Sequence, residues 1–160
     1  MKKADTVRQL KSQHQELQNT VHSLTEKQLT QEKVFDDWSV KDILAHITAW
    51  HRKANEELND LAQGKEPWIV GVDRDRFNQE AVEKGKDSTW EKVLEDWEES
   101  LSALLQKIEI IPQEQWDAET SFHWPDGTPM TRESLFSYDY EGSNHEGGHL
   151  SQIKRRFALD

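Results

Sequence analysis

The clearest periodicity in this chain lies in Trp90-Glu-Lys-Val-Leu-Glu-Asp-Trp-Glu-Glu-Ser-Leu-Ser-Ala-Leu-Leu-Gln-Lys-Ile108. Apolar residues recur in it every three or four positions, and they are Trp90, Val93, Leu94, Trp97, Leu101, Leu104, Leu105 and Ile108. This spacing places them along one side of an α-helix. Because Ser88-Thr89 can cap its start and Pro112 follows its end, the stretch predicts a helix over 88–110.

Three other stretches show the same helical spacing. The first predicts a helix over 3–24. The second begins with Ser39 and Asp42, a pair typical of a capping box, and predicts a helix over 39–62. The third follows several turn residues and predicts a last helix over 131–157. The sequence therefore predicts an all-α four-helix bundle.

Two connections are long for such a bundle, in which about 2 to 8 residues join neighbouring helices. Residues 63–87 are long enough to run the whole length of the bundle as a crossover, so we expect helices 39–62 and 88–110 to be parallel. Helix 39–62 would then be antiparallel to helix 131–157. Residues 112–130 hold aromatic side chains with few apolar repeats, so we expect a strap across the bundle surface.

Length and composition limit the classes of protein to which this chain can belong. The 160 residues fit one domain spanning 1–160, and the hydrophobic fraction of 34% suits narrow apolar stripes on helices. A net charge of -11 repels phosphate backbones and anionic lipid, so we expect neither nucleic acid nor a membrane as a partner. Cysteine is absent, which excludes a disulfide framework and a thiolate nucleophile. With no long apolar run, the expected location is cytoplasmic.

Two histidines near the end of the chain suggest a metal site. His145 and His149 stand four residues apart, so a helix places both imidazoles on one face. His46 is the candidate third ligand, because it lies about 10 Å from the start of its helix. His149 lies at a similar distance from the end of an antiparallel helix. Three neutral histidines with open coordination positions would form a working metal site.

Two glutamates lie near the histidines in the sequence, and the identity of the general base stays open between them. His145 to His149 matches the H-E-x-x-H pattern of metalloproteases, but no His or Glu follows it to supply the third ligand of that class. Glu146 should point about 100° away from the histidine face, whereas Glu141 should lie one turn below His145. Either carboxylate can serve as a catalytic base or as a hydrogen-bond acceptor behind the ligands.

The alternative to a metal site is that His145 and His149 merely line a polar face of the helix. Gly142, Gly147 and Gly148 argue against it, because each costs roughly 1 kcal/mol in a helix interior. Close approach of another group explains these glycines better. Among the remaining histidines, we assign His14 to packing or the site wall. The others are interpreted as surface or strap residues, namely His22, His51 and His123.

Two motifs carry a resemblance to a known family. Trp38-Ser-Val-Lys-Asp-Ile-Leu-Ala-His-Ile47 and Asn144-His-Glu-Gly-Gly-His-Leu-Ser-Gln-Ile153 resemble the DinB/YfiT-like superfamily, and the first also resembles its ClbS/DfsB branch. The resemblance implies a four-helix bundle with a crossover between helices 2 and 3, usually dimeric. It also implies that His46, His145 and His149 bind a divalent ion. Many relatives have His-Arg-Gly-Gln where this chain has His149-Leu-Ser-Gln152.

Three functions are compatible with these features. A metal on three histidines can activate water to hydrolyse a small molecule, or it can bind a low-molecular-weight thiol for transfer or isomerisation. The alternative is a metal-independent binding or sequestering protein. Zinc or nickel is the expected ion. We expect the substrate pocket to be formed by Trp38, Trp50, Tyr138 and Gln152, with Trp124 as a further wall. A homodimer is expected, because Trp90 and Trp97 supply more apolar surface than one seam needs.

Overall fold

The computed structural model describes all residues 1–160. The chain is all-α, with seven α-helices, two short 3₁₀ turns and no strands, which confirms the predicted class. The helices are α1 (Lys3–Ser23), α2 (Glu26–Thr30), α3 (Val40–Ala62), α4 (Arg74–Lys86), α5 (Trp90–Glu109), α6 (Gln113–Trp116) and α7 (His145–Arg156), and the 3₁₀ turns are η1 (Trp68–Gly71) and η2 (Glu133–Leu135).

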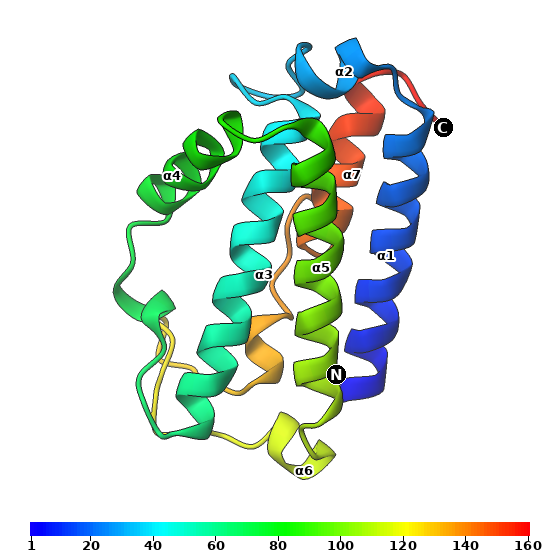
Figure 1. The fold of residues 1–160 in the computed structure, drawn as a ribbon. Helices are drawn as coiled ribbons and strands as arrows, with labels where there is room; N and C mark the ends of the chain where they lie inside the picture. Colours follow the sequence, from blue (N-terminus) through cyan, green and yellow to red (C-terminus); the bar gives the residue numbers. More distant parts are fainter.

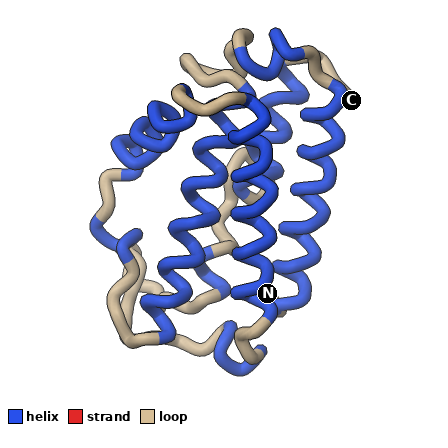
Figure 2. Tube along the Cα trace, viewed as in Figure 1, coloured by secondary structure: helices blue, strands red, loops and turns tan.

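Four of these helices, α1, α3, α5 and α7, lie side by side (Figure 1). In this view α3 and α5 run downward, whereas α1 and α7 run upward. Helix α3 is therefore parallel to α5 and antiparallel to α7, as the long connection predicts. Residues 63–89 return from the lower end of α3 to the upper end of α5 and carry α4 on the outside (Figure 2).

Side-chain caps fix the starts of the two central helices. The Ser39 hydroxyl accepts a hydrogen bond from the Asp42 amide at 3.3 Å, and the Asp42 carboxylate accepts one from the Ser39 amide at 3.0 Å. This is the predicted capping box. The Thr89 hydroxyl caps α5 by accepting from the Lys92 amide at 3.1 Å. Helices α3 and α5 share the largest helix–helix contact, so their apolar stripes form the centre of the fold.

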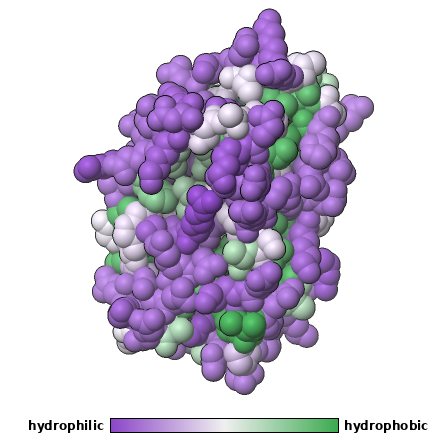
Figure 3. Space-filling model, viewed as in Figure 1, coloured by the Kyte–Doolittle hydropathy of each residue, from purple (hydrophilic) through white to green (hydrophobic).

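The surface carries no large apolar area on the face that Figure 3 shows, where hydrophilic residues predominate. Trp97 is 0% exposed, so it packs inside the chain and supplies no surface for a dimer. The sequence argument for dimerisation was wrong on this residue, whereas Trp90 is half-buried and packs against the core. The homodimer stays a prediction. None of the helices combines the length and apolar character needed to span a bilayer.

The last helix is shorter than predicted. It begins at His145, and the preceding residues form η2 and a turn in which Tyr140 and Ser143 pair as an isolated bridge. Glu141 and Gly142 have φ values of 54° and 80°, which no α-helix accommodates. The prediction of a helix from residue 131 was therefore wrong, because a turn occupies the positions that we assigned to helical spacing.

Candidate metal centre

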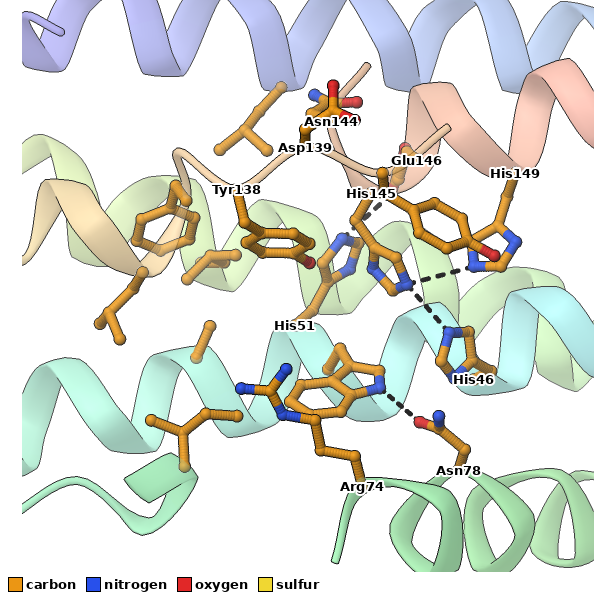
Figure 4. Close-up of a pocket in the computed structure, with 18 of the residues that line it drawn as sticks. His46, His51, Arg74, Asn78, Tyr138, Asp139, Asn144, His145, Glu146 and His149 are labelled. Atoms are coloured by element: carbon orange, nitrogen blue, oxygen red, sulfur yellow. Dashed lines mark hydrogen bonds and ion pairs between the residues drawn. The ribbon is translucent and has the colours of Figure 1, made fainter. Parts of the chain in front are cut away.

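Three histidine side chains converge between α3 and α7 (Figure 4). The Nε2 atom of His145 lies 2.9 Å from Nε2 of His46 and 3.1 Å from Nε2 of His149. The candidate ligand atoms of all three residues lie within 4.8 Å of one another, and His46 and His149 are buried. The structure thus brings together the three histidines that the sequence singled out.

The donor set fits a divalent metal ion. With zinc–nitrogen bonds of about 2.0–2.1 Å, tetrahedral geometry separates two ligand nitrogens by about 3.3 Å, close to the observed spacing. Burial, and then the neighbouring imidazoles, hold the pKa values of His46 and His145 well below the usual value. Burial likewise lowers the pKa of His149 to about 4. All three rings are therefore neutral at pH 7 and offer lone pairs to a cation.

Gln152 orients one of these rings. The Nδ1 atom of His149 donates to the Gln152 side-chain oxygen at 2.9 Å, which leaves Nε2 as the lone-pair nitrogen. The Gln152 amide nitrogen donates in turn to the Tyr140 hydroxyl at 3.0 Å. Gln152 does not line the cavity, so its predicted place in the pocket wall was wrong. Its position behind His149 is that of a residue that orients a ligand.

The glycines of the last motif have two different causes. A Cβ atom at Gly147 would collide with the Ser143 side chain, and one at Gly148 would collide with the Tyr140 ring. These two glycines make room for neighbouring groups, as the sequence suggested. Gly142 instead serves the turn before α7, where its positive φ is required. Asn144 then caps α7 by accepting from the Gly147 amide at 2.8 Å.

Glu146 is the centre of a buried hydrogen-bond network. One carboxylate oxygen accepts from Trp97 Nε1 at 3.1 Å and from His51 Nε2 at 3.0 Å, and the other accepts from His14 Nδ1 at 3.2 Å. Burial alone would raise the pKa of Glu146, but the hydrogen bonds from His14 and His51 outweigh it and lower the pKa to about 2. Glu146 is therefore a fixed anion, which is a poor proton acceptor at neutral pH.

His14 bridges two carboxylates. Its Nδ1 faces Glu146 and its Nε2 lies 3.0 Å from the Glu98 carboxylate. Burial opposes the charged form, but these two partners outweigh it and raise the pKa of His14 above the usual value. Because both ring nitrogens face acceptors, His14 is an imidazolium that links α1 to α5 and α7. The sequence had assigned it only to packing or the site wall.

His51 was misassigned to the surface. It is 6% exposed, and its Nδ1 lies 2.8 Å from the Ser100 hydroxyl while its Nε2 faces Glu146. The signal was present in the sequence, because His51 follows Ile47 by four residues on the apolar stripe of α3. His22 and His123 are exposed, as predicted.

Glu141 does not occupy the position that the sequence predicted. It lies in the turn before α7 and not one helical turn below His145, and its side chain is 41% exposed. Its carboxylate pairs with Arg155 at 3.2 Å and does not line the cavity. The structure therefore removes the premise that made Glu141 a candidate base.

A cavity of about 540 Å³ opens beside the three histidines. The predicted walls Trp38, Trp50, Trp124 and Tyr138 all line it, although Tyr138 lies in a loop and not on a helix. About half of its lining residues are aromatic or aliphatic and the rest are polar or charged, so the cavity combines apolar walls with polar groups that can orient a small molecule. Glu57 also lines it.

Glu57 makes the stability of the protein depend on pH. Burial, only partly offset by Lys53, raises the pKa of its carboxyl from 4.5 to about 7. A raised carboxyl pKa stabilises the fold below the unfolded value, and this contribution is lost as the pH rises through 7. We expect Glu57→Gln to be more stable than wild type at pH 8 by up to about 3 kcal/mol, and nearly equal at pH 4. Urea unfolding at the two pH values measures this difference, and an equal difference at both would contradict it.

The helices and the three converging imidazoles define an all-α protein with a candidate metal centre beside a small-molecule cavity. The chain belongs to the family of the mycothiol maleylpyruvate isomerase N-terminal domain, whose model matches residues 10–136. This confirms the DinB/YfiT-like resemblance. The matched region includes His46 and ends before His145. No curated protein matches the chain.

Solved structures with the same fold are distant in sequence. The colibactin self-resistance protein ClbS, solved in complex with double-stranded DNA, superposes with a TM-score of 0.73 at 14% identity over 98% of this chain and 95% of its own. An uncharacterised protein from Escherichia coli UTI89 gives a TM-score of 0.75 at 10% identity, over 98% and 93%. A protein from Streptococcus pneumoniae gives 0.69 at 12% identity, over 99% and 92%. At these identities the likeness concerns the fold.

Proposed function

We propose that His46, His145 and His149 bind one divalent ion, zinc or nickel, and that the protein is a metal-dependent enzyme acting on a small molecule. The observation that carries this proposal is the convergence of three neutral Nε2 atoms beside the cavity. Three lone pairs so close to one another repel unless a proton or a cation lies between them, and a ring nitrogen offers at most one proton.

The reaction that we favour is transfer to, or isomerisation with, a low-molecular-weight thiol. A bound ion would supply a Lewis acid that lowers the pKa of a water or thiol in an open position. The family includes a mycothiol-dependent isomerase by name, and the chain has no cysteine to act as its own nucleophile. Hydrolysis of a small molecule is the second candidate within the same class.

The residues of this chain would hold and enclose the reactants. Gln152 fixes the His149 ring, and Trp38 and Trp50 form apolar walls that exclude water from the reacting groups. Glu146 accepts three hydrogen bonds already, so we assign it to positioning and not to proton transfer. It holds His14 and His51 in place behind the ligands.

Cobalt substitution tests the thiol reaction. We expect protein loaded with Co²⁺ to gain a sulfur-to-cobalt charge-transfer band in the near ultraviolet when a low-molecular-weight thiol such as glutathione or cysteine is added. A metal held by three histidines would keep a coordination position open for the thiol, which is the reason for this expectation. Protein whose His149 is replaced by alanine is the control and should not retain the cobalt. An unchanged spectrum at saturating thiol would favour hydrolysis.

A different class remains as the alternative, a metal-independent binding or sequestering protein. Its support is the fold that the chain shares with the self-resistance protein ClbS. Protein that stays metal-free after dialysis against zinc, nickel and manganese would favour it.

Several broader features remain predictions. They are a single domain over 1–160, a cytoplasmic location and a homodimer, which light scattering would show as twice 18.8 kDa. The absence of a nucleic-acid partner is also a prediction. It has support in the net charge of -11, although the structural neighbour ClbS was crystallised with DNA.

A further inference from the structure

The end of the cavity remote from the histidines contains a buried carboxylate that the metal chemistry does not use. Glu57 is 3% exposed, yet it lines the cavity, and its Oε2 atom has no hydrogen-bond partner. An unpaired buried carboxylate is costly for a protein, and native structures usually provide such a group with a partner. The neighbouring lysine, Lys53, pairs with Glu56 instead, at 2.6 Å. The missing partner of Glu57 is therefore to be sought in the cavity.

A guanidinium lines the same cavity. Arg74 is the first residue of α4, and Figure 4 shows its side chain extending into the cavity lining without an ion pair to any residue drawn. It is close enough to Glu57 to affect the pKa of that carboxyl, but the two groups form no ion pair. Arg74 is exposed to solvent, whereas Glu57 is buried without a partner, so this end of the cavity presents an unpartnered carboxylate and a planar cation.

The position of these two groups sets the length of a ligand that would reach both ends. Glu57 follows His46 by eleven residues, and both line the cavity together with Trp50 and Ala54. At a rise of about 1.5 Å per residue, their Cα atoms lie about 16 Å apart along α3. The cavity therefore suits an elongated molecule with an apolar middle.

We propose that Glu57 and Arg74 form a second subsite that binds the ammonium and the carboxylate of an amino-acid end group. This end group belongs to an elongated ligand whose other end reaches the three histidines. An ammonium would give Glu57 its missing partner, and a carboxylate matches the fork of the Arg74 guanidinium. A ligand without the ammonium would leave the buried Glu57 carboxylate unpaired, and one without the carboxylate would leave the exposed Arg74 guanidinium to water. Binding at the subsite does not require a metal. The part of the proposal in which the other end of the ligand contacts the histidines rests on the proposed function.

Calorimetric titration of the full-length, EDTA-treated protein tests the subsite. The probes are L-2-aminooctanoic acid, octanoic acid and 1-aminooctane, which share one chain length and differ only in the charged end. We expect the amino acid to bind at least about tenfold more tightly than either singly charged probe, because it forms two charge-assisted contacts. Equal affinity for the three probes would overturn the proposal.

Two substitutions with a matched control locate the binding. Glu57→Gln and Arg74→Gln should each weaken binding of the amino acid about tenfold. Arg76→Gln should leave it unchanged, since Arg76 lies on the same helix but pairs with Glu80 at 2.9 Å outside this cavity. A structural role for Glu57 would show as a lower melting temperature in Glu57→Gln. The binding role predicts weaker binding in a variant at least as stable as wild type, and a destabilised variant would overturn it.

A fourth probe separates this proposal from the metal function. The ω-hydroxamate of L-2-aminosuberic acid carries a metal-binding group at one end and the amino acid at the other. Zinc-loaded protein should bind it more tightly than EDTA-treated protein does. If zinc does not strengthen binding of the hydroxamate while L-2-aminooctanoic acid still binds, the result would contradict the metal function alone. Zinc-dependent binding that Glu57→Gln and Arg74→Gln leave unchanged would contradict the subsite alone.

Discussion

Replacement of His145 by alanine is expected to lower the affinity for zinc by more than about 100-fold. Loss of a group that only orients a ligand commonly costs about 10–100-fold, and removal of a ligand itself should cost more. His145 is the central member of the cluster, because its Nε2 lies within 3.1 Å of Nε2 in both other rings. Zinc competition with a chromophoric chelator measures the change.

Two further variants calibrate this result. Gln152→Ala should lose about 10–100-fold in zinc affinity, because it frees the His149 ring without removing a donor. His22→Ala should change nothing, since His22 is exposed and outside the cluster. Helical circular dichroism should be the same in all variants, because apolar packing and not the metal stabilises the helices. Full zinc affinity in His145→Ala would contradict the proposed site.

Replacement of Glu146 by alanine is expected to destabilise the fold by about 3–5 kcal/mol, the usual cost of removing one partner of a buried charge network. The change leaves His14 with Glu98 as its one carboxylate partner, takes the carboxylate away from His51, and leaves the buried Trp97 N–H without a partner. Urea unfolding at pH 7 measures the difference.

The pH dependence of this effect follows from the lowered pKa. Because the pKa of Glu146 falls from 4.5 to about 2 on folding, the carboxylate stabilises the fold above pH 4.5. That contribution is lost as the pH falls toward 2, so wild type and variant should converge in acid. Glu141→Ala is the matched control, because its exposed ion pair should change stability by less than about 1 kcal/mol. Equal losses in the two variants at pH 7 would refute the network.

The helical part of the fold could be predicted because it depends on local patterns. The stripe from Trp90 to Ile108 and the cap at Ser39 predicted α5 and α3 to within two residues. The start of α7 could not be predicted from spacing. Tyr138 and Gly142 fall at helical intervals before His145, but a turn with two positive φ values interrupts them. Backbone conformation of this kind leaves no trace in hydrophobic periodicity.

The candidate ligands could be predicted because the spacing of the imidazoles and the directions of their helices can both be inferred from the sequence. The network around Glu146 could not, because His14, His51 and Trp97 come from helices whose rotation about their axes is set by packing. Glu57 gave no signal for a similar reason. A single glutamate in an amphipathic helix is usually solvated, and only the fold places this one against the cavity.

X-ray absorption at the zinc K-edge is the measurement that tests the metal centre most directly. Wild-type protein loaded with one equivalent of zinc should show nitrogen scatterers at about 2.0 Å and the outer-shell pattern of three imidazole rings. The His46→Ala protein should lose one imidazole from that pattern or fail to retain the zinc. Zinc surrounded by oxygen ligands alone in the wild type, or an identical spectrum in His46→Ala, would contradict the assignment of His46, His145 and His149 as the ligands.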